Sequence, residues 1–151
     1  MTKVTKDTKL KVRRIKKSDA KQVAVLSGQL GYPATSAQIL RRIRGLKPAS
    51  EHAVFVADLP GTGIVGWLHA SVAHVLESDT RAEVNGLIVA DGQRSLGAGA
   101  QLLDAAEKWS RQRGCTAMNV RSNVIRERAH KFYERQGYEH YKSQKAFRKP
   151  L

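Results

Sequence analysis

Two spaced glycines, Gly97 and Gly99, constrain this chain more than any other feature, because they join an apolar stretch to an amphipathic one. Residues 84–89 predict a strand, and residues 98–113 predict a helix with Leu102, Ala106 and Trp109 on one stripe. Glycine allows tight turns and close backbone approach, and the amides that open a helix favour an anion. The junction therefore predicts a phosphate-bearing ligand, or else a tight turn without one.

Length and charge bound the remaining possibilities. The 151 residues predict one domain over residues 9–151, preceded by a basic arm at residues 1–8. The formal net charge of +14 favours anionic partners, and the N-terminal basic residues are read as a solvated terminus or as a phosphate or nucleic-acid contact. With no long apolar run and no secretory pattern, we expect a cytoplasmic protein that does not enter a membrane.

Cysteine and histidine usage exclude other classes of site. The lone Cys115 cannot form an internal disulfide and is expected to be a core thiol. The five histidines are scattered without metal-ligand spacing, so no metal site is predicted.

The order of periodic segments predicts an α/β (α+β) domain. Helices are expected over residues 18–30, from residue 36, up to about residue 113 and over residues 125–136. Strands are expected at residues 10–15, 53–57, 64–72, 82–89 and 115–120, with a closing pair at 138–141 and 145–148. The second and third strands form an antiparallel hairpin, whereas the strands on either side of the long helix form a right-handed parallel crossover.

Two nucleotide motifs fail at the glycine junction. A phosphate loop needs Gly-Lys-Ser/Thr, but Gly99 is followed by Ala100 and Gln101. The dinucleotide fingerprint needs a third glycine where Leu102 stands, and an acidic residue about 20 positions later, where none is found. Neither class of nucleotide site is predicted.

A third pattern fits: Arg or Gln, two variable residues, Gly, any residue, then Gly or Ala. Residues 94–99 match it, and a Phe-Tyr-Glu-x-x-Gly-Tyr block follows at residues 132–138. Through these motifs nearly the whole chain resembles the GNAT superfamily of N-acetyltransferases, most closely its small-molecule and aminoglycoside-type members. The resemblance implies a mixed, mostly antiparallel twisted sheet of six to seven strands, flanked by about four helices. A parallel strand pair is splayed around the cofactor.

The resemblance also implies the cosubstrate, acetyl-CoA, and the residues that hold it. Amides of the glycine segment would bind the pyrophosphate, and the strand before it would pair with the pantetheine arm. Asn123 is expected to contact CoA or to cap the last helix. The full set of expected cofactor-binding residues is Leu87, Ile88, Val89, Arg94, Ser95, Leu96, Gly97, Ala98, Gly99, Ala100 and Asn123.

Acetyl transfer requires a neutral amine and a proton for the departing thiolate. The resemblance implies Tyr133 as the general acid, the alternative being a packed tyrosine. Glu83 stands where histone acetyltransferases of the superfamily carry their catalytic glutamate, so it is a candidate base or an exposed strand end. Tyr32, Trp67 and His69 are candidate substrate contacts, with scaffold, core and bystander roles as the alternatives.

The sequence thus predicts an N-acetyltransferase that moves an acetyl group from acetyl-CoA to a primary amine of a small molecule, by direct attack in a ternary complex. The open alternatives are a protein amino-group acetyltransferase and a non-catalytic acyl-CoA sensor. A nucleic-acid-binding module is disfavoured because no basic surface interleaved with aromatic residues is visible. A homodimer is left open.

Overall fold

The computed structural model describes residues 9–29 and 31–151, and for Arg94 and Ser95 it describes the backbone alone. The basic arm at residues 1–8 lies outside the described residues. The chain forms two compact units, Met1–Val120 and Arg121–Leu151. Each unit is described by itself.

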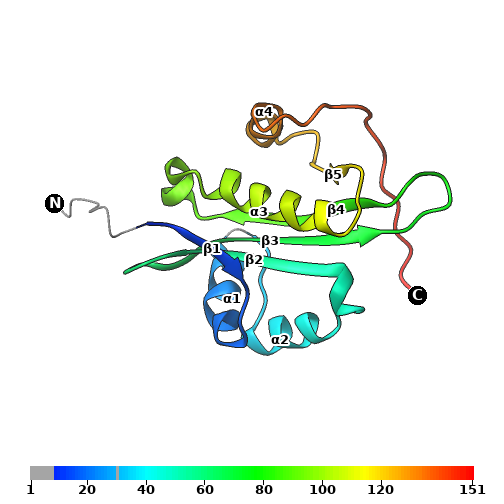
Figure 1. The fold of residues 1–151 in the computed structure, drawn as a ribbon. Coiled ribbons are helices and arrows are strands. Elements are labelled where there is room, and N and C mark those ends of the chain that lie inside the picture. The colour runs from blue at the N-terminus through cyan, green and yellow to red at the C-terminus, as the bar shows by residue number, and fades with distance from the viewer. Residues whose placement is uncertain (1–8, 30) are drawn as a thin grey trace. The chain divides into compact units, whose positions relative to one another are not determined.

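The first unit is built on one five-stranded sheet (Figure 1). Its strands lie in chain order: β1 (Lys11–Arg14), β2 (His52–Leu59), β3 (Gly63–Ala73), β4 (Arg81–Val89) and β5 (Met118–Val120). Neighbouring strands are antiparallel except for β4 and β5, which are parallel. The predicted hairpin and the predicted parallel pair are therefore both confirmed.

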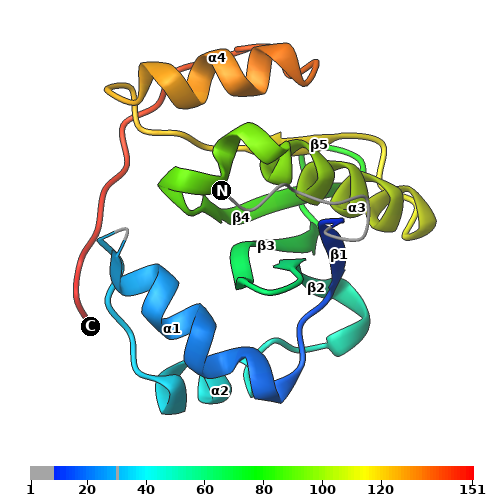
Figure 2. The same ribbon diagram turned by 90° about the vertical axis from the view of Figure 1, so that its left-hand side faces the viewer.

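Three helices cover the two faces of this sheet. Helices α1 (Ala20–Gln29) and α2 (Ser36–Arg44) lie on one face and α3 (Ala98–Gln112) on the other, as both ribbon views show (Figures 1 and 2). Thr35 caps α2 because its hydroxyl accepts a bond from the amide of Gln38 at 3.1 Å. The largest fully buried side chains are Val56, Leu68, Leu102 and Leu103, so the core lies around β2, β3 and α3.

The entry into α1 is fixed by an acidic residue near its start. Asp19 is 4% exposed, ends a short 3-10 turn (Lys17–Asp19) and accepts the amide of Lys16 at 2.7 Å. Its carboxylate also accepts two bonds from Arg13 of β1, at 2.8 and 3.0 Å, and these bonds lower the pKa of Asp19. Arg13 reaches Asp58 of β2 as well, at 3.2 Å, so one ion-pair network ties β1, β2 and α1 together.

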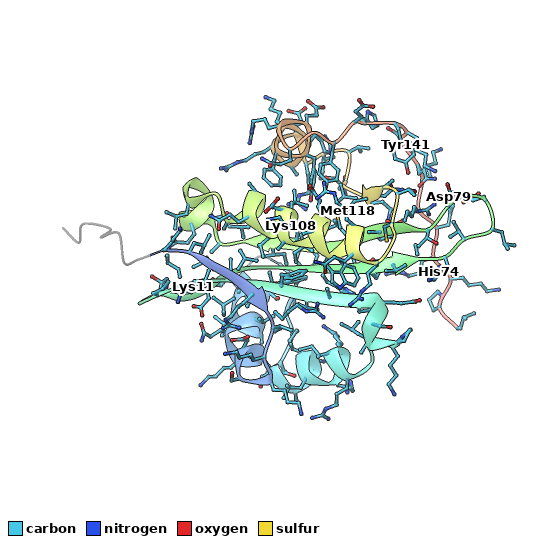
Figure 3. The ribbon with its side chains drawn as sticks, in the orientation of Figure 1. Lys11, His74, Asp79, Lys108, Met118 and Tyr141 are labelled. Carbon is cyan, nitrogen blue, oxygen red and sulfur yellow. The ribbon has the colours of Figure 1, made fainter. Side chains whose placement is uncertain are left out.

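Alternation along β3 separates the two faces of the sheet. A Cβ atom at Gly66 would meet Leu102 of α3 at 3.3 Å, whereas the indole of Trp67 bonds Ser27 of α1. Trp67, His69 and Ser71 therefore face the α1 side. Figure 3 labels Lys11 and His74, which lie at opposite ends of the sheet.

The second unit contains one helix, α4 (Glu127–Arg135), which is shorter than the predicted 125–136. Gly137 follows it at φ 89°. The predicted strands at 138–141 and 145–148 are wrong, because residues 136–151 contain no strand. In an extended conformation, the segment Lys145 to Arg148 would place no two apolar residues on the same face, so it has no apolar face to bury. Residues 139–151 are all exposed.

The observed architecture is thus an α+β fold with a mixed sheet and four α-helices. The sheet has five strands where six to seven were expected. Among the described residues, no helix is long and apolar enough to cross a membrane.

Candidate active site

The glycine junction forms the start of α3. A 3-10 turn (Asp91–Leu96) leaves β4, and Gly97 follows at φ 72° as the N-terminal cap. The first bond of the helix runs from the amide of Gln101 to the carbonyl of Gly97 at 3.0 Å. The amides of Ala98, Gly99 and Ala100 precede that bond and have no partner within the helix. A Cβ atom at Gly97 would meet nothing within 4 Å among the described residues.

An open backbone edge runs beside this junction. Strand β5 pairs with β4 only from Ala82 to Val84, although β4 continues to Val89 along β3. Among the described residues, no strand pairs with the β5 side of Leu87, Ile88 and Val89. Ala90 bonds Val65 of β3, so Ile88 also directs its amide and carbonyl to β3, whereas those of Leu87 and Val89 point to the open edge and are available to an extended ligand. These two features fit the pantetheine and pyrophosphate parts of acetyl-CoA.

Two of the predicted substrate contacts attach to the same residue of α1. The indole nitrogen of Trp67 donates to the hydroxyl of Ser27 at 3.2 Å. The amide of Tyr32 donates to the carbonyl of Ser27 at 2.8 Å, which leaves the Tyr32 side chain 60% exposed. Ser27 is buried. Trp67 and Tyr32 thus both bond Ser27 near the C-terminal end of α1.

Glu83 lies on β4, directly opposite Ser71 of β3 and Asn119 of β5. Its carboxylate accepts a bond from Arg81 at 2.9 Å, and the side chain is only 13% exposed. Glu83 therefore does not lie at an exposed strand end, which was the alternative that the sequence left open. The ion pair with Arg81 holds the carboxylate in place on the α1 side of the sheet.

His69 does not stand alone on this face. Its Nε2 lies 3.1 Å from Nδ1 of His52 on β2, and the two rings stack with centroids 5.3 Å apart. Burial, with a smaller contribution from His52, lowers the pKa of His69 from 6.5 to about 4. His69 is accordingly neutral at physiological pH and either donates to or accepts from His52.

Tyr133 belongs to the second unit, on α4. Its ring packs edge-on against Phe132 and Tyr138, at centroid distances of 5.3 and 6.0 Å. Burial raises the pKa of Tyr133 above 10, against a smaller opposing effect of Arg126. The phenol therefore keeps its proton across the physiological range, as a general acid must.

Asn123 organises the turn that leads into α4. Its side-chain oxygen accepts the amide of Ile125 at 3.1 Å, and its carbonyl accepts the Nε2 proton of His130 at 2.8 Å. The cap position of α4 is Arg126, which makes no side-chain cap bond. Asn123 thus shapes the turn ahead of the helix and does not cap it.

Several polar residues on the α1 side of the sheet were not predicted from the sequence as site residues. His52, Ser71, Arg81 and Asn85 join the predicted residues, and Asn85 donates to the hydroxyl of Ser71 at 2.8 Å. Counting outward from the hairpin turn would have placed His52 near His69, but the predicted strand began one residue after His52. Over the described part of the chain, no group of three His, Cys, Asp or Glu side chains could hold a metal ion.

Comparison with known proteins identifies this architecture. The model of the acetyltransferase (GNAT) family matches residues 26–138, which is more than half of the chain. The chain belongs to the GNAT family of acetyltransferases. The predicted family is confirmed.

Individual relatives are more distant. The aminoalkylphosphonate N-acetyltransferase of Salmonella typhimurium is 35% identical over 75 residues, which are 48% of this chain and 49% of that enzyme. The match thus spans about half the length of that curated relative.

Solved structures share the fold at lower identity. An aminoglycoside 6'-N-acetyltransferase from Acinetobacter baumannii superposes with a TM-score of 0.79 at 19% identity, covering 94% of this chain and 99% of that one. Glucosamine-6-phosphate N-acetyltransferase from Arabidopsis thaliana gives 0.79 at 18% identity, covering 92% and 97%. An aminoglycoside N-acetyltransferase in complex with CoA gives 0.81 at 22% identity, covering 94% and 95%.

Proposed function

We propose that this protein transfers the acetyl group of acetyl-CoA to a primary amine of a small molecule. The observation that carries the proposal is the glycine junction. Gly97 turns the chain at φ 72°, and the first three amides of α3, which have no partner within the helix, follow directly after it. A helix start of this kind attracts the pyrophosphate, and the strand edge suits the amides of pantetheine.

The reaction needs one proton removed and one supplied. The amine nitrogen attacks the thioester carbonyl, the carbon–sulfur bond breaks, and the thiolate takes a proton. An amine with a lysine-like pKa of about 10.4 is neutral in only about one molecule in 10³ at pH 7, so a base increases the reactive fraction. Glu83 is the proposed base and Tyr133 the proposed acid. A donor to the developing oxyanion is expected among the amides of Leu87 to Val89.

The other proposed roles follow the same arrangement. Amides from Leu96 to Ala100 hold the pyrophosphate, Arg94 and Ser95 lead into that segment, and Asn123 contacts CoA. Tyr32, Trp67 and His69 line the acceptor side.

Charge favours an acceptor that is not a polycation. Several carboxylates of the first unit are paired: Glu83 with Arg81, Asp19 and Asp58 with Arg13, and Glu51 with His74. The whole chain carries +14. This net charge disfavours a multiply charged cation and attracts an amine with an anionic group. The aminoalkylphosphonate enzyme provides a precedent for that substrate class.

Release of free thiol from acetyl-CoA tests the proposal across three amines: an aminoalkylphosphonate, an alkylamine of similar length that lacks the anionic group, and an aminoglycoside as the polycation. We expect amine-dependent release, with the highest kcat/KM for the phosphonate. CoA binding without amine-dependent release from any of them would instead support an acyl-CoA sensor.

The same assay addresses the order of transfer. Direct attack in a ternary complex predicts no burst of thiol when the enzyme meets acetyl-CoA without an amine. A stoichiometric burst would indicate an acetyl-enzyme intermediate and would contradict direct attack.

A further inference from the structure

Four polar residues stand opposite one another across four strands of the sheet. His52 of β2 pairs with Ser71 of β3, Ser71 with Glu83 of β4, and Glu83 with Asn119 of β5. Directly opposite residues share a face, and their Cβ atoms lie about 5 Å apart on antiparallel strands. We call these four residues the cross-sheet row. Because Ser71 shares its face with Trp67, the row lies on the α1 side, where the proposed acceptor contacts are.

The bonds around the row leave a direction for proton movement. Ser71 accepts a bond from Asn85 at 2.8 Å, so its own hydroxyl proton can be donated along the row. Arg81 holds the Glu83 carboxylate in place, with its Nε 2.9 Å from Oε1. Ser71 is its neighbour across the strands, and His52 is the neighbour of Ser71.

The far end of the row is a paired imidazole. His52 Nδ1 and His69 Nε2 lie 3.1 Å apart. Because burial keeps His69 neutral, its Nε2 can remain an acceptor for the Nδ1 proton of His52. That arrangement fixes the tautomer of His52 and leaves its Nε2 as the nitrogen that can accept a proton.

The charged groups around this pair do not compete for the same atoms. Arg14 donates to the backbone carbonyl of His52 at 3.3 Å and not to its ring. Glu51 is bound to His74 at 2.8 Å. On the helix side, the buried residues of α1 from Val23 to Ser27 are apolar or carry a hydroxyl.

We propose that the cross-sheet row is a proton path from the reacting amine, running from Glu83 through Ser71 to His52, with His69 as the positioning residue that fixes the tautomer of His52. The inference rests on the proposed acetyltransferase function. The amine loses its proton to the Glu83 carboxylate. Ser71 takes that proton, directly or through one water, as it donates its own to Nε2 of His52. The resulting imidazolium then releases the proton to solvent. No oxidant, metal or further reactant is needed.

His52→Gln tests the path, with His140→Gln as the matched control. His140 is exposed in the second unit, where its Nε2 lies 3.0 Å from the hydroxyl of Ser143. We expect His52→Gln to lower kcat about 10-fold with KM for the amine changed less than about twofold, and to remove the acidic limb of the kcat–pH profile. His140→Gln should behave as wild type. A His52→Gln enzyme with wild-type kcat and an unchanged acidic limb would overturn the proposal.

The positioning role of His69 is tested by two substitutions. His69→Gln keeps a carbonyl oxygen that can accept the Nδ1 proton of His52, whereas His69→Leu removes the acceptor. We expect His69→Gln to stay within about threefold of wild-type kcat and His69→Leu to lose about 10-fold. Equal activities for the two variants would contradict the assigned role.

A measurement without substrate separates this inference from the proposed function. Nitrogen-15 spectra of the imidazole rings in the intact protein report which nitrogen carries the proton. We expect the proton on Nδ1 in both His52 and His69, and a proton on Nε2 of His69 would overturn the relay. If wild-type protein releases no thiol with any amine, the proposed function fails, whereas the spectra still decide the state of the pair.

Discussion

Gly86→Ala should displace Trp67 from its place on the α1 face. Gly86 lies on β4 beneath the indole, and a Cβ atom there would stand 2.8 Å from both Cζ3 and Cη2 of Trp67. Atoms of two side chains do not approach so closely, so the indole must move. Its movement would also lengthen the 3.2 Å bond from the indole nitrogen to the buried hydroxyl of Ser27.

The cost combines these two effects. Overpacking in a filled site destabilises by about 1–3 kcal/mol. Loss of a single neutral hydrogen bond adds about 1 kcal/mol. We therefore expect Gly86→Ala to lower the free energy of unfolding by about 2–4 kcal/mol. Because Trp67 is a proposed wall of the acceptor site, KM for the amine should rise about 10-fold while KM for acetyl-CoA changes little.

Urea unfolding at constant m measures the change in the free energy of unfolding, and Gly28→Ala is the matched control. Gly28 lies in α1, and a Cβ atom there would meet nothing within 4 Å, so alanine should stabilise the helix by about 0.5–1 kcal/mol. Fluorescence adds a local readout because the chain has two tryptophans, and Trp109 lies on the opposite face. A Gly86→Ala protein within about 0.5 kcal/mol of wild type, with unchanged Trp67 emission, would refute this packing.

Three further outcomes are expected. Gly97→Ala forces a side chain into φ 72°, which should cost about 1–2 kcal/mol of stability and weaken CoA binding about 10-fold by calorimetry. The control is Gly61→Ala, at φ 85° in the hairpin turn, which should cost similar stability and leave CoA binding unchanged. Tyr133→Phe should reduce kcat about 100-fold with a good acceptor, and an unchanged kcat would rule out the acid role. Because burial raises the pKa of Tyr133, the tyrosine-dependent rate should persist to pH 10. The lowered pKa of His69 means that the unfolded chain binds the proton more tightly, so stability should fall as pH drops from 6.5 to about 4. The difference in the pKa of His69 between the folded and unfolded chain is worth about 3 kcal/mol, which solvent screening reduces to about 2 kcal/mol. In urea titrations at the two pH values, His69→Gln should lack this loss of stability.

The sequence predicted the elements of the first unit because their periodicity is strong. The hairpin, the strand before Gly97 and the long helix after it all lie within a few residues of their expected positions. The parallel crossover followed from a strand, a helix and a strand in succession. These features depend on local pattern and chirality, which a single sequence carries.

Neighbours across the sheet were not predicted, because register is not a local property. A bulge after His69 pairs His69 with Gly86 but Ala70 with Val84, which leaves Asn85 between two rungs of the ladder. That extra residue places Asn85 against Ser71. Periodicity alone gives no sign of the bulge, so the cross-sheet row was invisible before the structure.

The closing strands were overpredicted for a related reason. Short runs with a few aromatic residues, such as 138–141, match a strand pattern, but a strand forms only where a partner pairs with its backbone. Among residues 121–151, all of which are described, none is buried. The aromatic contacts of Tyr133 and Tyr138 organise that unit in place of a sheet.

The proposed acetyl transfer is tested by the stoichiometry of acetylated amine and free CoA that the protein forms from acetyl-CoA. We expect equal amounts of the two products, formed only when an amine is present and faster for an aminoalkylphosphonate than for an aminoglycoside. Tight CoA binding with neither product formed from any amine would contradict it.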